Sequence, residues 1–208
     1  ILIDIGGGTS DIIIFNNNSI IHTGAIPLGG ENLTKDIAYG LNTSLENAEI
    51  IKCKNGIAKE SLADDQKIIK ILGTNGREDK EISEKYLASI IQPRVNEIFN
   101  LAKNEVNRSD YDGDFTFGII LTGGGASLSG ITDIAQEIFN MPVKIGIPDT
   151  INGKADIINN PRYATGIGII KYVIENKNNL NEQFEISIKN SSINTFINKI
   201  KNVFKKIN

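Results

Sequence analysis

The stretch that decides the fold class is Ile3-Asp4-Ile5-Gly6-Gly7-Gly8-Thr9-Ser10-Asp11, in which three consecutive glycines separate two apolar runs. The run Ile1–Ile5 precedes the glycines and the run Asp11–Phe15 follows them, a pattern that predicts two strands joined by a tight turn. After the asparagines at 16–18, the segment Ser19–Ile26 predicts a third strand. The chain therefore opens with a β-meander, unlike the strand–loop–helix of a P-loop or a dinucleotide-binding fold.

The first glycine turn is a candidate phosphate site. Because Gly6, Gly7 and Gly8 have no side chains, their backbone N–H groups can converge on an anion. Asp4, at the end of the first strand, is placed to hold a Mg²⁺ ion through water molecules, and Thr9 offers a hydroxyl to the same phosphates. A hairpin turn that binds no ligand is the alternative interpretation.

A second glycine turn, Gly123-Gly124-Gly125, follows a predicted strand at Phe115–Leu121 and precedes a predicted helix at Ile131–Phe139. Its backbone can lie flat against a nucleoside, or the helix N-terminus can face a phosphate. Between the two turns, Glu49 and Lys52 are three residues apart on one helix face, so that a carboxylate and an ammonium group can reach one ligand. A solvated surface ion pair is the alternative for these two residues.

The remaining segments alternate helical and extended patterns, which predicts an α/β fold. Apolar spacing predicts helices from Gly30 to Leu41 and through Ala48–Lys52, and polar residues 73–80 predict a loop. A longer helix is expected over Ser83–Arg108, where Pro93 should kink or interrupt it. The other expected elements are strands at Gln66–Leu72 and Val143–Ile147 and a helix at Arg162–Ile174.

Together these motifs resemble the second half of the actin/Hsp70/sugar-kinase nucleotide fold. The first glycine turn looks like its second phosphate hairpin, and residues 122–125 look like its adenosine loop. The resemblance covers about residues 1–172 and narrows to the FtsA family, the bacterial cell-division homologues of actin. The stretches that carry it are residues 22–27, 33–39, 47–52, 92–94, 121–126 and 143–148.

The resemblance implies an actin-like (ribonuclease H-like) ATPase half, with ATP and Mg²⁺ as cofactors. Residues 1–28 and 115–175 would form the core subdomain, and residues 29–114 an inserted smaller α+β subdomain. Glu49 and Lys52 fall where the family contacts ribose and adenine. The half that carries the first phosphate hairpin would precede Ile1, so this chain looks like the C-terminal half alone.

The resemblance also implies partners. Members of the family assemble into filaments through subdomain contacts, and the inserted subdomain receives the C-terminal peptide of FtsZ. Arg94 is a candidate contact for that acidic peptide. The expected role is an adaptor that tethers the FtsZ ring to the inner face of the cytoplasmic membrane at the division site.

The C-terminal segment 191–208 predicts an amphipathic membrane-targeting helix after a polar linker at 176–190. Its apolar side chains recur at i, i+3, i+4 and i+7, and no acidic residue accompanies its lysines. A helix docked on the protein body is the alternative. The apolar positions are Ile193, Phe196, Ile197, Ile200, Val203, Phe204 and Ile207, and the basic ones are Lys199, Lys201, Lys205 and Lys206.

Charge and composition exclude several function classes. Without the four tail lysines, the first 190 residues have 18 basic and 25 acidic side chains, a net charge of −7. This charge disfavours nucleic acid as a partner of the body, whereas the basic tail favours binding to an anionic surface. The single cysteine, Cys53, cannot form an internal disulfide, and the single histidine, His22, has no evident catalytic or metal partner. We therefore expect no catalytic residues and at most weak ATPase activity.

Two alternatives to the adaptor remain from the sequence. One is an ATP-dependent chaperone or kinase of the same superfamily, and the other is a type IV pilus assembly adaptor. The basic amphipathic tail disfavours the chaperone and the kinase, and the FtsA-like stretches disfavour the pilus adaptor.

Overall fold

The computed structural model describes residues 1–71, 73, 78–113, 115–148 and 159–176. The chain divides into two compact units, one of Ile1–Ile147 with Asn160–Arg162 and the other of Pro148–Asn159 with Tyr163–Asn208. All candidate nucleotide and FtsZ contacts lie in the first unit. The predicted membrane helix, residues 191–208, and nearly all of the predicted linker lie outside the described residues.

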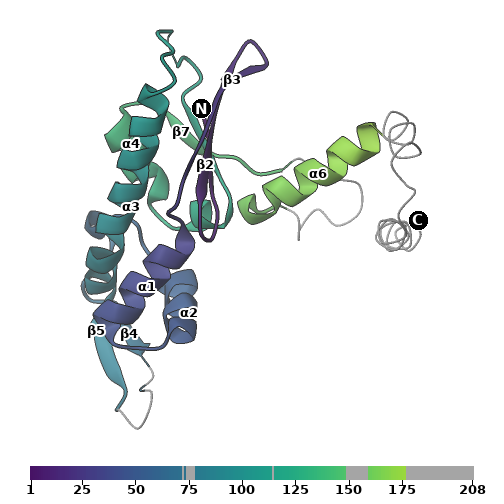
Figure 1. Ribbon diagram of the computed structural model, residues 1–208. Coiled ribbons are helices and arrows are strands. Elements are labelled where there is room, and N and C mark those ends of the chain that lie inside the picture. The colour runs from purple at the N-terminus through teal and green to yellow at the C-terminus, as the bar shows by residue number, and fades with distance from the viewer. Residues whose placement is uncertain (72, 74–77, 114, 149–158, 177–208) are drawn as a thin grey trace. The chain divides into compact units, whose positions relative to one another are not determined.

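The first unit is built on a five-stranded mixed sheet with the strand order β3-β2-β1-β6-β7 (Figure 1). Strand β1 is antiparallel to β2 and parallel to β6, and β3 and β7 form the two edges. The predicted meander is therefore confirmed. The strands are β1 (Leu2–Ile5), β2 (Ser10–Asn16), β3 (Ser19–Ile26), β6 (Ile119–Thr122) and β7 (Val143–Ile145).

One face of this sheet is apolar and packs against helices. Register pairs Ile3 with Ile12 on one side and with Leu121 on the other, and all three side chains are fully buried. Helix α3 (Glu84–Asn107) packs against β2 and β3, while α4 (Ile131–Phe139) packs against α3 and β7. Burial of this continuous apolar layer stabilises the unit and leaves the other face of β1 for polar groups.

A helical layer follows β3 along the chain. Helix α1 (Gly30–Leu41) packs against α2 (Leu45–Asn55) and α3, and buries Leu33 and Ile37, as the apolar spacing predicts. A short 3₁₀ turn at Glu60–Leu62 then leads to the two-stranded hairpin of β4 (Ile68–Ile71) and β5 (Lys80–Ser83).

Three expectations about the elements are wrong. Strand β5 was not predicted: it begins at Lys80, the last residue of the predicted polar loop, and β4 supplies a partner for its backbone. The strand expected from Phe115 begins only at Ile119, since Gly118 adopts a φ of +67° in a turn and Phe117 is 97% exposed. Strand β7 also ends at Ile145, short of the predicted Ile147.

Helix α3 runs through Pro93 without an interruption, so of the two expected outcomes, a kink or a break, the break does not occur. Proline removes one N–H donor, but the buried face of this 24-residue helix is supported on both sides of Pro93, by Ile91 and Val95. Packing therefore outweighs the single missing hydrogen bond.

In the second unit, helix α6 (Ala164–Glu175) confirms the last predicted body helix within two residues at its start and one at its end. Within the described part of the chain, no helix is both long and apolar enough to cross a membrane.

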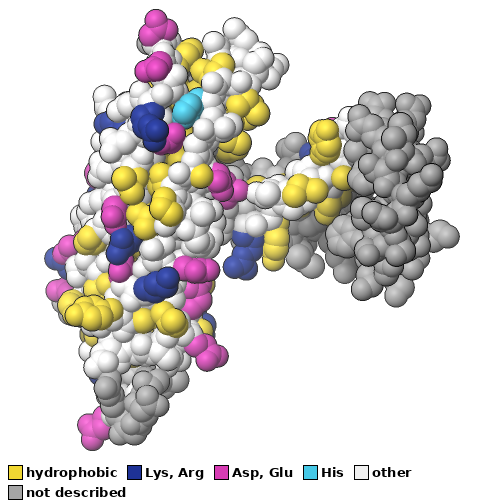
Figure 2. Space-filling model, in the orientation of Figure 1, with side chains coloured by type: hydrophobic (Ala, Val, Ile, Leu, Met, Phe, Trp, Pro, Cys, Tyr) yellow, Lys and Arg dark blue, Asp and Glu magenta, His cyan; other side chains and the backbone are white. Residues whose placement is uncertain are grey.

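Charged side chains of both signs are interspersed over the visible face of the first unit (Figure 2). Several ion pairs in the first unit join elements that are separate in sequence. The Lys67 ammonium lies 2.6 Å from the Glu84 carboxylate, and the Lys59 ammonium lies 2.5 Å from that of Glu137.

Candidate functional site

The first glycine turn is joined by hydrogen bonds to the start of helix α1. The Gly6 N–H donates to the Thr9 carbonyl oxygen at 2.9 Å and closes the turn. The Gly30 and Glu31 N–H groups then donate to the carbonyl oxygens of Gly6 and Gly7 at 2.9 and 2.8 Å. Two of the donors that a helix N-terminus leaves unpaired therefore fix the turn to α1. Gly8 and Thr9 stay exposed at its tip.

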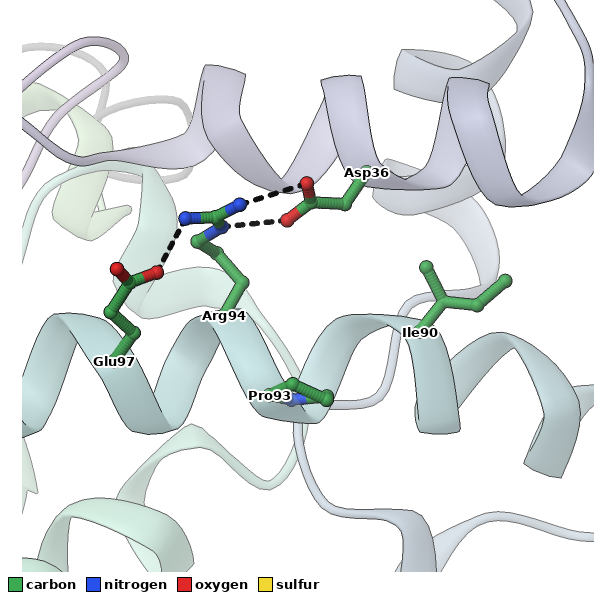
Figure 3. A pocket seen from close by; sticks show the side chains of 5 residues that line it. All are labelled: Asp36, Ile90, Pro93, Arg94 and Glu97. Atoms are coloured by element: carbon green, nitrogen blue, oxygen red, sulfur yellow. Dashed lines mark hydrogen bonds and ion pairs between the residues drawn. The ribbon is translucent and has the colours of Figure 1, made fainter.

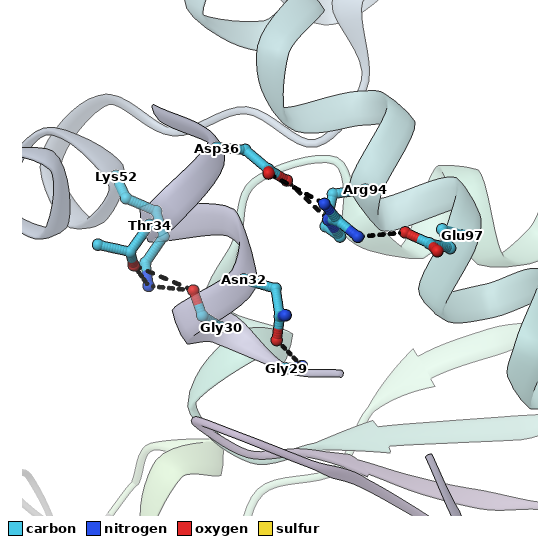
Figure 4. Close-up of polar contacts among 8 residues, drawn as sticks. All are labelled: Gly29, Gly30, Asn32, Thr34, Asp36, Lys52, Arg94 and Glu97. Carbon is cyan, nitrogen blue, oxygen red and sulfur yellow. Dashed lines mark hydrogen bonds and ion pairs between the residues drawn. The ribbon is translucent and has the colours of Figure 1, made fainter. Parts of the chain in front are cut away.

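This close approach requires glycine at the N-cap of α1. A Cβ at Gly29 would lie 2.5 Å from the Gly7 carbonyl oxygen, closer than real Cβ contacts allow. The Gly29 N–H also donates to Asn32 Oδ1 at 3.0 Å, which closes a capping box (Figure 4). We expect any larger residue at position 29 to push the turn away from the helix.

The second glycine turn lies beside the first because the strands that precede the two turns are parallel neighbours. Asp4 of β1 pairs with Thr122 of β6, so the two turns follow the carboxyl ends of neighbouring parallel strands, at the same end of the sheet. Gly123 adopts a φ of +84°, and a Cβ there would overlap Asp4 Oδ1. Only glycine lets the second turn approach the Asp4 carboxylate this closely.

The polar face of the sheet adds a residue that the sequence did not single out. Asp11 of β2 pairs directly with Asp4, so the two carboxylates and the Thr122 hydroxyl share one face beside the first glycine turn. Like charges at paired positions repel each other. A bound cation relieves that repulsion, so the two carboxylates fit the expected Mg²⁺ ion. The Thr122 hydroxyl is buried and donates instead toward the carbonyl oxygens of Gly146 and Pro161. A prediction of strand register across the turn would have identified Asp11.

Glu49 and Lys52 belong to a compact group that we call the α1–α2 cluster: Gly30, Thr34, Glu49 and Lys52. The Lys52 Nζ donates to Thr34 Oγ1 at 2.8 Å and to the Gly30 carbonyl oxygen at 2.9 Å (Figure 4). It also donates to Glu49 Oε2 at 2.7 Å. The Lys52 side chain is only 13% exposed. The solvated surface pair is therefore the wrong interpretation for the lysine, which is held against α1.

The Glu49 carboxylate is held by its neighbours. Burial raises its pKa, but hydrogen bonds from Lys52 and Thr34 outweigh that effect, and the net pKa is lowered. Its second oxygen, Oε1, accepts a hydrogen bond from Cys53 Sγ at 3.3 Å. Burial and the Glu49 carboxylate raise the pKa of the Cys53 thiol, so the thiol stays protonated near neutral pH.

The end of α2 reaches the segment after the second glycine turn. The Ala58 N–H donates to the Ser129 carbonyl oxygen at 2.8 Å, and Ile57 forms a single β-bridge to the same residue. The short 3₁₀ helix at Gly124–Ser127 directly precedes this contact. The structure therefore brings the first turn, the α1–α2 cluster and the second turn to one side of the unit.

Arg94 lies apart from these residues, in what we call the α1–α3 cluster: Asp36, Arg94 and Glu97. Its Nε and Nη2 atoms donate to Asp36 Oδ2 and Oδ1 at 2.6 and 3.0 Å, and Nη1 pairs with Glu97 (Figure 3). The paired Asp36 carboxylate raises the pKa of the guanidinium further. These residues line a pocket of about 270 Å³ together with Ile90 and Pro93.

Comparison with known proteins identifies the family. A family model described as cell division protein FtsA matches residues 1–168. Cell division protein FtsA of Pseudomonas aeruginosa is 41% identical over 174 residues, which cover 84% of this chain and 42% of that protein. The FtsA of Escherichia coli K12 is 32% identical over an alignment of 213 residues, which covers 99% of this chain and 50% of that protein.

A solved structure agrees with this match. MreB5 of Spiroplasma citri bound to AMPPNP has a TM-score of 0.65 and 25% sequence identity, over 85% of this chain and 54% of that chain. This likeness confirms the actin-like α/β fold. The chain spans about half the length of the curated relatives that it matches. The match favours the cell-division family over the chaperone, the kinase and the pilus adaptor, and the chain belongs to the FtsA family of cell division proteins.

Proposed function

We propose that this chain forms the nucleotide-binding half of an actin-like cell-division adaptor. The whole protein binds ATP with Mg²⁺, assembles into filaments and tethers the FtsZ ring to the inner face of the cytoplasmic membrane at the division site. The observation that carries the proposal is that two glycine turns and the α1–α2 cluster converge at the carboxyl ends of β1 and β6. The AMPPNP-bound structure of the MreB5 relative supports it.

Each part of the site has a distinct role in this proposal. The N–H groups of Gly7 and Gly8 and the Thr9 hydroxyl hold the phosphates, whereas the Gly6 N–H, which was also expected to do so, donates to the Thr9 carbonyl oxygen and closes the turn. Asp4 holds Mg²⁺ through water, with Asp11 beside it. Mg²⁺ prefers oxygen ligands and combines carboxylate, phosphate and water, so its chemistry here is to neutralise phosphate charge. Glu49 contacts the ribose, and Lys52, whose ammonium group already has three protein acceptors, holds Glu49 in place beside the adenosine. Gly123–Gly125 form the wall for the adenosine.

Isothermal titration calorimetry on the whole protein that contains this chain tests the nucleotide proposal. Asp4→Ala should weaken ATP binding at least tenfold in the presence of Mg²⁺ and much less in EDTA. Asp65→Ala, at an exposed position before β4, is the matched control and should bind as the unaltered protein does. Equal losses with and without Mg²⁺ would contradict the role of Asp4.

Membrane tethering rests on the contrast between the acidic body and the basic segment 191–208. Removing residues 191–208 should release the protein from anionic liposomes, and Phe204→Glu should do nearly the same, because it places a charge on the apolar side. Lys→Gln at the four tail lysines should reduce binding without abolishing it. If the truncated protein sediments with liposomes as well as the intact one, the tethering proposal is wrong.

We also propose that the pocket beside Arg94 receives the C-terminal peptide of FtsZ. Ile90 and Pro93 supply apolar surface there, and Arg94 is held in a fixed orientation by its bidentate pair with Asp36. Because Glu97 adds a second carboxylate, an acidic peptide has to compete with it for the guanidinium.

A further inference from the structure

Thr34 lies at the centre of the α1–α2 cluster, although nothing in the sequence pattern marks it as functional. Its side chain is on the second turn of α1, one turn after Gly30, and the residue is only 6% exposed. Its hydroxyl oxygen lies 3.0 Å from the Gly30 carbonyl oxygen and 2.8 Å from Lys52 Nζ (Figure 4). It also contacts Glu49 Oε2.

The hydrogen bonds of this cluster form a closed set. The Lys52 ammonium has three protons, and its three acceptors are Gly30, Thr34 and Glu49. The Thr34 hydroxyl accepts from Lys52 and has one proton, which it donates to either the Gly30 carbonyl oxygen or Glu49 Oε2. Loss of the hydroxyl therefore leaves the lysine with a proton that has no protein acceptor.

The consequence for Glu49 depends on which carboxylate oxygen is held. Oε2 is fixed by Thr34 and Lys52, whereas Oε1 has only the weak thiol donor Cys53 at 3.3 Å. The Glu49 side chain is 48% exposed, so that without the Oε2 contacts it is free to rotate in solvent. With them, Oε1 points in one direction and stays ready to accept a ligand hydroxyl.

The same helix turn reaches the phosphate side. Gly30, whose carbonyl oxygen contacts Thr34 and Lys52, donates its own N–H to the Gly6 carbonyl oxygen. Gly30 therefore links the two parts of the site: its carbonyl oxygen contacts the α1–α2 cluster, and its N–H group contacts the phosphate turn. Thr34 is placed to keep the two in a fixed relation.

We propose that Thr34 is a positioning residue that orients Glu49 toward a ribose hydroxyl and thereby sets the preference of the site for ribonucleotides over deoxyribonucleotides. This inference rests on the proposed nucleotide-binding function. Thr34 acts through Glu49 and Lys52 and does not itself touch the nucleotide.

The test compares ATP, 2′-deoxy-ATP and 3′-deoxy-ATP by calorimetry on the whole protein that contains this chain. The unaltered protein should prefer ATP about tenfold over at least one deoxy analogue, because a lost hydrogen bond to a charged group is worth roughly one decade. Thr34→Val, which removes the hydroxyl at nearly constant volume, should reduce this preference to less than twofold. Thr34→Ser should restore it.

Two variants separate positioning from mere stability. Ile37→Val, one turn further along α1, removes a buried methyl group and should lower stability without changing the preference. Thr34→Ala serves in place of Thr34→Val if the valine variant does not fold, and should lose the preference in the same way.

The outcomes distinguish this inference from the function on which it rests. If the unaltered protein does not bind ATP, both fail. If it binds ATP and Glu49→Gln abolishes the preference while the Thr34 variants keep it, the proposed function stands and the role of Thr34 is overturned. A protein that binds all three nucleotides equally also overturns it.

Discussion

Helix α1 carries a charged cluster on each of two sides, and the clusters differ in how completely their cation is neutralised. Thr34 and Asp36 are two residues apart, which places them about 200° apart around the helix. On one side Lys52 meets a single carboxylate and is 13% exposed. On the other, Arg94 meets two carboxylates and is 27% exposed.

The difference between the clusters shows how burial decides whether an ion pair fixes the positions of side chains or remains available to a binding partner. The α1–α2 cluster is neutral overall, and its lysine is mostly buried with three protein acceptors, so its bonds fix positions. The α1–α3 cluster carries a net charge of −1 and borders a pocket, so its charges remain available to a partner. The same helix therefore separates a site that depends on geometry from a site that depends on charge balance.

Lys52→Met, with Arg94→Met as its matched partner, should have the largest effect. Removing the ammonium leaves the half-exposed Glu49 carboxylate without its cation and three acceptors without their donor, so we expect the free energy of unfolding to fall by roughly 1–2 kcal/mol and ATP affinity to fall more than tenfold. Arg94→Met should cost roughly 1 kcal/mol and leave ATP affinity within twofold. Urea unfolding measures the free energy of unfolding, and calorimetry measures the ATP affinity. If the two variants lose ATP affinity equally, the proposed difference between the two clusters is wrong.

Charge substitutions in the α1–α3 cluster should have a smaller effect, on peptide binding. The effect should have opposite signs for Glu97 and Arg94. Glu97→Gln removes the surplus negative charge and should strengthen binding of an acidic FtsZ C-terminal peptide by about threefold at low salt. Arg94→Ala should weaken the same binding. The control is Glu81→Gln, whose carboxylate pairs with Lys70 on the β4–β5 hairpin at 3.7 Å. Fluorescence anisotropy of a labelled peptide measures all three, and weaker binding after Glu97→Gln would contradict the pocket proposal.

Much of the fold was predictable because local patterns and tertiary packing agree. The meander, both helices of the α1–α2 pair and helix α4 follow from apolar spacing and glycine turns. Strand β5 was missed because Lys80-Glu81-Ile82-Ser83 carries a single apolar residue, and only the pairing with β4 makes it a strand. The strand expected from Phe115 was started too early because nothing local shows that Phe117 faces solvent.

The candidate site was predictable in its residue types but not in its connections. The glycines, Asp4, Glu49 and Lys52 follow from motifs, whereas Thr34 has no motif and matters only through residues 15 and 18 positions away. Likewise, the bonds from α1 to the first glycine turn join backbone groups, which side-chain patterns do not reveal. The charge balance around Arg94 also required the structure, because Asp36 lies 58 residues away.

The smallest expected effect is a pH dependence that belongs to the α1–α2 cluster. The pKa of Glu49 is lowered in the folded protein relative to its ordinary value of 4.5. A group whose pKa is depressed by folding stabilises the fold above its unfolded pKa, and that contribution is lost as the pH falls through the folded pKa. We therefore expect Glu49→Gln to cost less than about 1 kcal/mol at pH 7, with the difference from the unaltered protein shrinking below pH 4.5.

The same group allows the contributions of its neighbours to be ranked. Thr34→Val should raise the pKa of Glu49 toward its ordinary value, because the hydroxyl is one of the hydrogen bonds that favour the carboxylate. Cys53→Ala removes a weaker donor from the other oxygen and should raise the pKa less. Carbon-13 NMR titration of the Glu49 side-chain carboxyl measures both shifts. A larger shift from Cys53→Ala than from Thr34→Val would mean that the thiol, and not the Thr34 hydroxyl, orients this carboxylate.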